Sequence, residues 1–218
     1  MTVAPDALLG ALRSGDAAAV ARLLADDPAL VECTAPGGES LVLHACYVGA
    51  AASARVFAGG RPLDACEAAA LGDTVALAAA FTRDANAHAL FSGDGWTPLH
   101  LAGFFGQDAC AEFLLASGAS LTAISKNSTG NTPLHAALAG STNTALVQRL
   151  VAAGANVCAR GERSITPLHL AAMRGDRSLC ELLIAHGAET GAAMDDGTQP
   201  STLAIAQGHP ELGAMLTP

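Results

Sequence analysis

Histidine, cysteine and carboxylate side chains can bind a metal ion or catalyse a reaction, and three histidines of this chain recur at a regular spacing. His100, His135 and His169 each end the tetrapeptide Thr-Pro-Leu-His, and they lie 35 and 34 residues apart. If each tetrapeptide opens one unit of a stack, equivalent side chains stay too far apart to converge on one ion. The pattern therefore predicts no metal site, and we expect each histidine to form a hydrogen bond with the backbone of the neighbouring loop.

Other residues of these types gather further towards the N-terminus. His44, Cys46 and Cys66 lie close in sequence to Asp64 and Glu67. They form no recognisable catalytic triad and no metal-ligand spacing. We therefore predict no catalytic residue, no metal and no cofactor. A small-molecule binder or an enzyme with a pocket at this place remains the alternative.

Composition excludes several classes of partner. The 218 residues include 20 Asp and Glu against 11 Lys and Arg, a net charge of −9. Nucleic acids and anionic membranes attract basic patches, so neither is an expected partner. The six cysteines are dispersed, as is typical of a reducing compartment. The first apolar stretch contains Asp6 and Arg13, unlike a signal-peptide core. We therefore expect a cytoplasmic, monomeric protein.

Each tetrapeptide opens a pattern that predicts two helices. In residues 97–120 a segment of small residues follows the tetrapeptide, and apolar residues then recur at helical spacing as far as Leu115. Thr97 is a good N-cap, and Pro98 fits the first helical turn, where its missing N–H costs nothing. Gly118 suits the left-handed residue that ends the second helix.

The pattern Ala-x-x-x-Gly at the end of the first helix extends the repeat over the whole chain. Successive alanines, from Ala11 to Ala204, lie 34, 23, 34, 35, 34 and 33 residues apart. We therefore predict a single domain, residues 1–218, of seven units, of which the outer two act as caps. The predicted units are residues 5–36, 37–61, 62–93, 94–128, 129–162, 163–195 and 196–218.

The step of 23 residues makes the second unit about eleven residues shorter than the others. We predict that the region Arg55–Cys66 is a truncated or irregular unit and that Ala58–Pro62 connects the second unit to the third without a full hairpin. Gly59 and Gly60 are expected to adopt the unusual backbone dihedral angles of a tight connection.

The repeats resemble the ankyrin repeat family over about residues 6–216, and the alanine-rich chain looks like the stand-alone ankyrin proteins of bacteria with GC-rich genomes. The resemblance implies an all-α solenoid of about seven helix-turn-helix units with short β-hairpin loops. It also implies protein binding through the hairpin tips and the concave face of the first helices, without catalysis. Departures from the family pattern are the short second unit, Ser141 and Ser164 in place of glycines, and Ser201-Thr202 in place of Leu-His.

The residues just before each turn glycine, and those of the hairpins, are the candidates for contact with a partner. Several are aromatic, apolar or arginine, and Trp, Tyr and Arg are enriched where binding energy concentrates. In the alternative interpretation, Phe104 or Phe105 packs against a neighbouring repeat and Trp96 braces its own loop. We predict that an unidentified partner protein contacts Tyr47, Leu71, Trp96, Phe104, Phe105, Asn131, Arg160, Arg163, Ile165, Met173 and Arg174.

Overall fold

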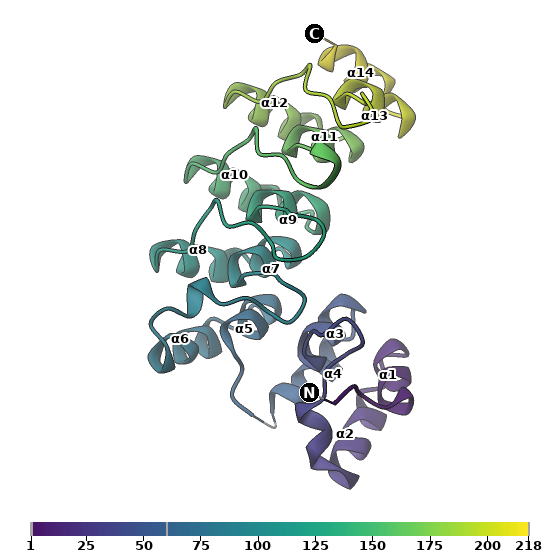
Figure 1. The fold of residues 1–218 in the computed structure, drawn as a ribbon, viewed down its shortest axis with the longest axis vertical. Helices are drawn as coiled ribbons and strands as arrows, with labels where there is room; N and C mark the ends of the chain where they lie inside the picture. Colours follow the sequence, from purple (N-terminus) through teal and green to yellow (C-terminus); the bar gives the residue numbers. More distant parts are fainter. Residues whose placement is uncertain (1, 60, 218) are drawn as a thin grey trace.

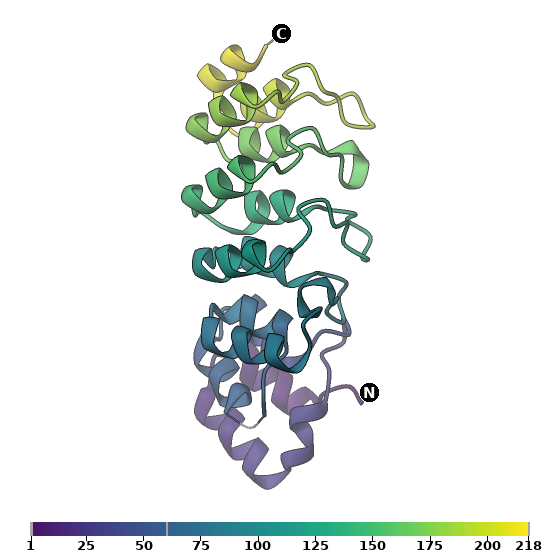
Figure 2. The same cartoon turned by 90° about the vertical axis from the view of Figure 1, so that its left-hand side faces the viewer.

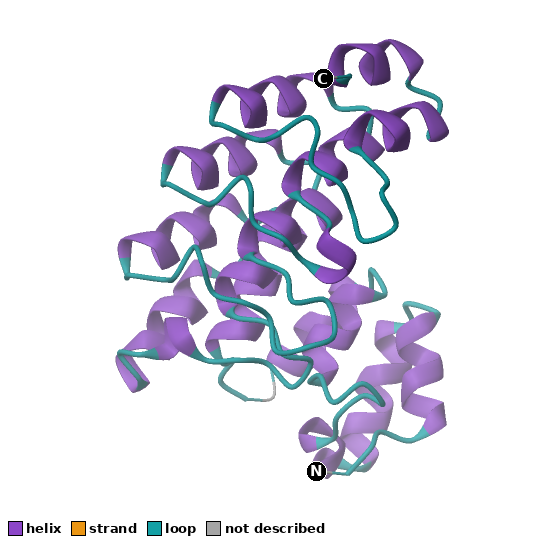
Figure 3. Ribbon diagram, turned by 45° about the horizontal axis from the view of Figure 1, so that its top comes forward, coloured by secondary structure: helices purple, strands orange, loops and turns teal. Residues whose placement is uncertain are grey.

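The computed structural model describes residues 2–59 and 61–217 and consists of stacked helix pairs (Figure 1). The described residues form fourteen α-helices and no β-strand, with isolated bridges from Thr34 to Val3 and to Ser40. Consecutive helices pair through short turns, which gives seven pairs in two rows with the connecting loops on one side (Figures 2 and 3). The predicted all-α solenoid of about seven helix-turn-helix units is confirmed.

The two rows contain the first and the second helices of the pairs. The first helices are α1 (Asp6–Arg13), α3 (Leu41–Tyr47), α5 (Ala65–Leu71), α7 (Pro98–Phe105), α9 (Pro133–Gly140), α11 (Pro167–Met173) and α13 (Pro200–Ala206). The second helices are α2 (Ala17–Asp26), α4 (Ala51–Ala58), α6 (Thr74–Arg83), α8 (Asp108–Ala116), α10 (Thr144–Ala152), α12 (Arg177–Ala185) and α14 (Pro210–Leu216). Short 3₁₀ helices are η1 (Pro28–Glu32), η2 (Ala87–Ala89) and η3 (Glu162–Ser164).

The tetrapeptide histidines join neighbouring units, as predicted. The backbone N–H of Thr97 donates to Nδ1 of His100 at 3.4 Å, so the proton of the neutral ring is assigned to Nε2. Nε2 then donates to the carbonyl oxygen of Asn131 in the next loop at 2.8 Å. The corresponding Nε2-to-carbonyl bonds join His135 to Ile165 at 3.2 Å and His169 to Thr198 at 3.1 Å.

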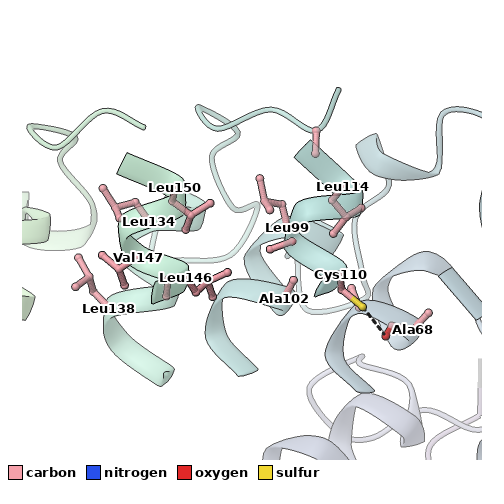
Figure 4. Close-up of a cluster of buried hydrophobic side chains, with 14 of the residues drawn as sticks. Ala68, Leu99, Ala102, Cys110, Leu114, Leu134, Leu138, Leu146, Val147 and Leu150 are labelled. Carbon is pink, nitrogen blue, oxygen red and sulfur yellow. Dashed lines mark hydrogen bonds between the residues drawn. The ribbon is translucent and has the colours of Figure 1, made fainter. Parts of the chain in front are cut away.

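The main hydrophobic core lies between the two rows of helices and runs along the stack. Figure 4 shows part of it, with Leu99 of α7, Leu114 of α8 and Leu134 of α9 turned inward. All three are essentially fully buried, and burial stabilises by about 1.5–3 kcal/mol for each such side chain. Leu115, by contrast, is only half-buried.

The loops that precede the first helices end in tight turns, which we call tips and number by the unit they open. In each tip the first residue donates its backbone N–H to the carbonyl oxygen of the last residue, at 2.8–2.9 Å. Backbone N–H groups of tips 5, 6 and 7 donate to carbonyl oxygens of the preceding tip at 2.8, 2.7 and 3.0 Å. The tips are residues 35–39 (tip 2), 92–96 (tip 4), 125–131 (tip 5), 161–165 (tip 6) and 194–198 (tip 7).

The third unit has no tip, as the short step predicts. α4 ends at Ala58 and α5 begins at Ala65, and the described residues between them form no tip. The unusual dihedral angles predicted for Gly59 are wrong, because its φ of −70° is an ordinary right-handed value, and Gly60 lies outside the described residues. Tips 2 and 4 therefore become neighbours, and the carbonyl of Gly38 leaves no room for a Cβ atom on Gly93.

Candidate functional site

The exposed side of the first helices and the adjoining side of the tips form what we call the concave face. Four predicted residues gather in its N-terminal half, and we call Tyr47, Trp96, Phe104 and Phe105 the aromatic cluster. The ring of Tyr47 in α3 lies 5.8 Å from that of Phe104 and 5.3 Å from that of Phe105, measured between centroids. The rings of Trp96 and Phe104 are 5.4 Å apart. The second and fourth units thus touch directly.

This contact crosses the third unit, because small residues leave the space for it. Cys66 and Ala70 of α5 are buried beneath Tyr47, Trp96 and Phe105 in an apolar cluster separate from the main core. On the other side of the cluster, the ring of Phe104 occupies the place where a side chain on Gly140 of α9 would lie. Aromatic residues of the second and fourth units therefore fill the N-terminal half of the concave face.

Hydrogen bonds fasten the aromatic cluster to tip 4. The hydroxyl of Tyr47 donates to Asp94 at 2.7 Å, and that of Ser92 donates to the other carboxylate oxygen at 2.5 Å. Burial and the neighbouring Asp94 raise the pKa of Tyr47, so the phenol keeps its proton. Trp96 is half-buried against His100 and Phe104. It is therefore less exposed than its place in a hairpin predicts. These contacts match the interpretation in which the aromatics brace neighbouring repeats.

Leu71 does not belong to the aromatic cluster. It packs against the main core and lines an open cleft of about 510 Å³ beside the third unit. Arg55 and Asp73 are the charged residues that line this cleft, and His44 and Cys46 are not among its lining residues. The cleft therefore brings together no acid–base pair or nucleophile that would support the alternative of an enzyme at this place.

Two charged pairs lie in the second and third units, although Nε2 of His44 is buried without a hydrogen-bond partner. Nδ1 of His44 lies 2.8 Å from Glu39, and the guanidinium of Arg61 donates to both carboxylate oxygens of buried Glu67, at 2.7 and 2.5 Å. Burial alone would raise the pKa of Glu67, but the hydrogen bonds and charge of Arg61 bring it below its ordinary value. Burial raises the pKa of the Cys46 thiol to about 12, which makes it a poor nucleophile. Among the described residues, no three such groups are arranged to hold a metal.

An open groove lies in the C-terminal half of the concave face, with a volume of about 340 Å³. Three predicted residues, Asn131, Arg163 and Ile165, come together there from tips 5 and 6. Sequence reasoning missed Leu170 of α11 and Met194 of tip 7. Leu170 occupies the same repeat position as Leu101, which is buried, so the repeat pattern did not mark it as a surface residue. The groove is lined by Thr129, Asn131, Ala139, Glu162, Arg163, Ile165, Leu170 and Met194.

The remaining predicted residues lie outside the groove. Met173, at the end of α11, is 40% exposed. Arg174 donates to two backbone carbonyl oxygens at the end of α9, at 2.9 and 2.6 Å, so its side chain joins the fifth and sixth units. Arg160 donates to the carbonyl oxygen just before tip 7 at 3.0 Å and lines a separate crevice.

Tip 6 has a strained backbone. Arg163 and Ser164 have φ values of +54° and +60°, and they alone combine a positive φ with a side chain among the described residues. In tip 4 the position of Ser164 is occupied by Gly95, which also has a positive φ. A residue with a side chain in the left-handed conformation destabilises the fold by about 1–2 kcal/mol relative to the right-handed conformation. Bonds to tip 7 hold the strained turn: Ser164 donates to Asp195 at 2.5 Å, and Arg163 pairs with Asp196 at 2.7 Å.

A model of the family described as ankyrin repeats, in three copies, matches residues 63–161 and 138–217. The chain belongs to the ankyrin repeat family. Proteins of this family generally serve as interaction scaffolds without catalysis. No helix in the described part of this ankyrin repeat chain is long and apolar enough to cross a membrane.

Several curated proteins resemble this chain over part of their length. Ankyrin repeat and SOCS box protein 16 of Mus musculus is 35% identical to this chain over 50% of its residues. The Homo sapiens protein of the same name is 30% identical over 81% of this chain. The matches cover 25% of the mouse protein and 47% of the human protein. RelA-associated inhibitor of Mus musculus is 45% identical over 28% of this chain and 7% of its own length. These relatives are mammalian and do not test the likeness to bacterial ankyrin proteins.

Proposed function

We propose that this chain is a cytoplasmic, monomeric interaction module that binds a partner protein through its concave face and tips and performs no catalysis. The groove is the observation that carries the proposal. It is an open, largely apolar recess. Its lining includes Asn131, Arg163 and Ile165, three of the residues that the sequence predicts to contact a partner. The small side chain of Ala139 leaves the recess accessible.

The distribution of charge supports this assignment. The first helices α7, α9, α11 and α13 contain no Asp, Glu, Lys or Arg, whereas tips 6 and 7 carry Glu162, Arg163, Asp195 and Asp196. An uncharged floor with a charged border corresponds to the apolar core and polar rim of protein interfaces. The exposed edges of the aromatic cluster and Met173 extend the proposed surface on either side of the groove.

The relatives support a role in binding another protein. Mouse RelA-associated inhibitor is, by its name, a protein that acts on another protein. The matches cover less than half of each relative, so we transfer only the general mode of action and none of their partners.

A capture experiment with two matched variants tests the proposal. Ala139→Glu places a charged side chain in the groove, and Ala145→Glu places the same side chain on the exposed side of α10, in the same unit. Both alanines are exposed helix residues, so both variants should remain folded. Tagged wild type and variants are incubated with lysate of the native organism, and bound proteins are quantified by mass spectrometry.

We expect the wild type and Ala139→Glu to differ. A partner bound by the wild type and by Ala145→Glu should be lost or strongly reduced with Ala139→Glu. If Ala139→Glu retains every protein that the wild type captures, the concave face at the groove is not the binding surface and the proposal fails.

A further inference from the structure

We infer that the groove binds an extended segment of the partner in which aliphatic side chains alternate with lysine or arginine. This inference rests on the proposed function and adds the chemical class of the partner segment. It follows from the floor of the groove, an unpaired hydrogen-bond acceptor, the charges of the rim and the rigidity of tip 6.

The floor and size of the groove select aliphatic side chains. Ile165, Leu170 and Met194 supply apolar walls from two tips and one helix, with Ala139 between them. The volume of about 340 Å³ lies at the lower end of the range for ligand pockets, about 300–1,000 Å³. The recess therefore accommodates single side chains of an extended chain rather than the body of a helix.

One buried polar atom beside the groove forms no hydrogen bond. Oδ1 of Asn131 is buried and unpaired, although the backbone of the same residue is bonded to His100 and Ser125. A buried acceptor without a partner costs about 1–3 kcal/mol. The terminal torsion of asparagine is soft, so the amide can turn toward the groove and accept an N–H of a bound segment.

The rim carries more negative than positive charge. Of three carboxylates on tips 6 and 7, only Asp196 has a cationic partner, the guanidinium of Arg163 at 2.7 Å. Glu162 lines the groove. The carboxylate of Asp195 accepts a hydrogen bond from the uncharged hydroxyl of Ser164, and its backbone N–H donates to the carbonyl oxygen of Arg163. No ion pair to Glu162 or Asp195 is present within residues 2–59 and 61–217. Two uncompensated carboxylates, on a chain of net charge −9, favour a cationic segment.

The strained turn of tip 6 holds this rim in place. The left-handed conformations of Arg163 and Ser164 persist because both side chains are bonded to tip 7. A rim that is already ordered loses little conformational entropy when a segment binds. The turn thus holds the carboxylate of Asp195 against tip 6, in which Glu162 lines the apolar recess.

Three synthetic peptides test the inference with the full chain. The first is Gly-Lys-Leu-Lys-Leu-Lys-Gly; the second replaces each lysine by glutamate; the third replaces each leucine by serine. Binding is followed by chemical-shift changes of the ¹⁵N-labelled protein. The lysine–leucine peptide should shift amides of the groove, and the other two should bind roughly tenfold more weakly, which corresponds to about 1.4 kcal/mol.

Two conservative variants locate the charge that is recognised. Glu162→Gln removes one rim carboxylate and should weaken the lysine–leucine peptide about threefold, the scale of one exposed ion pair. Glu211→Gln removes an exposed carboxylate from α14 and should leave the affinity unchanged. Unchanged amide spectra of both free variants outside the substituted sites show that they are folded.

Several results would overturn the inference. Equal binding of the glutamate peptide contradicts the cationic segment, and equal binding of the serine peptide contradicts the aliphatic side chains. Shifts confined to the aromatic cluster, or no shifts with any peptide, also refute it. The Ala139→Glu capture experiment uses intact proteins, so the broader proposed function can survive each of these results, or fail independently of them.

Discussion

The concave face carries large aromatic side chains in its N-terminal half and small side chains in its C-terminal half. Tyr47 and Phe105 meet across α5 in the first region, whereas Ala139 and Gly140 occupy the end of α9 in the second. Similar helix pairs therefore build two different surfaces. The size of the residues at the end of the first helix decides whether the chain fills the face itself or leaves a recess for a partner.

The two regions also differ in how their units are joined. Units 4, 5 and 6 are linked to the following loops by buried neutral histidines, whereas the third unit has the buried ion pair of Glu67 with Arg61. Acid therefore acts on the two regions at different pH values. The largest predicted effect follows from this difference.

Lowering the pH from 7 to 5 should first weaken the junctions that follow the fourth, fifth and sixth units. Burial lowers the pKa of His100 from 6.5 to about 4, and also lowers the pKa values of His135 and His169. Each contribution is complete above the unfolded pKa near 6.5 and is lost as the pH falls toward the folded value. For His100 alone the full loss below the folded pKa is on the order of 3 kcal/mol, of which about 2 kcal/mol is lost by pH 5. The pKa of Glu67 is lowered as well, so its contribution persists until the pH falls below about 4.5.

Urea unfolding at pH 7.5, 6 and 5, combined with hydrogen exchange, measures this effect. Amides of the loops from Asn131 to Thr198 should lose protection at pH 5 while those around Glu67 keep theirs. A free energy of unfolding that stays constant from pH 7.5 to pH 5, or a loss that begins in the third unit, would contradict the prediction.

Truncating an aromatic residue should cost more stability than truncating an exposed residue of the open half. Phe104→Ala should destabilise by about 2 kcal/mol, less than a fully buried phenylalanine because the side chain is half-buried. Met173→Ala is the control and should change the free energy of unfolding by less than about 0.5 kcal/mol. Equal losses in chemical denaturation would show that the aromatic cluster stabilises the fold no more than the open half does.

Removing one hydroxyl isolates the bond between the aromatic cluster and tip 4. Tyr47→Phe should destabilise by about 1 kcal/mol, because Asp94 loses a hydrogen-bond donor and the ring contacts remain. Tyr47→Phe should cost much less in an Asp94→Asn background, and a double-mutant cycle measures this coupling. Additive effects would mean that the hydroxyl and the carboxylate do not act together.

The smallest predicted effect is the release of strain in tip 6. Ser164→Gly should raise the free energy of unfolding by less than about 1 kcal/mol, because glycine accepts the left-handed conformation but the hydroxyl bond to Asp195 is lost. The matching change in tip 4, Gly95→Ser, should destabilise. Thermal unfolding of both variants compares the two tips directly, and a stabilised Gly95→Ser would refute the strain argument.

Features that depend on one unit and its nearest neighbour could be predicted from the sequence. The bond from His100 to the next loop follows from a repeated tetrapeptide. The contact of Tyr47 with Phe105 joins the second unit to the fourth. It could not be predicted, because the step of 23 residues does not reveal that these two units meet. Periodicity likewise placed Leu115 in the apolar pattern of the helix, although its side chain is only half-buried. Arg174 was a surface candidate because the sequence does not show the carbonyl oxygens that it binds.

The third unit contributes two helices to the stack but no tip to the row of loops. A partner that lies along the first helices meets the units one by one. A partner that lies along the tips passes from Gly38 to Gly93 as immediate neighbours. Helix pairs and tips therefore do not correspond one to one at the third unit, whereas each of the fourth to seventh units has its own tip. Inserting a hairpin between Ala58 and Ala65 would move every later tip by one place, and would alter recognition along the tips without changing any residue that touches the partner.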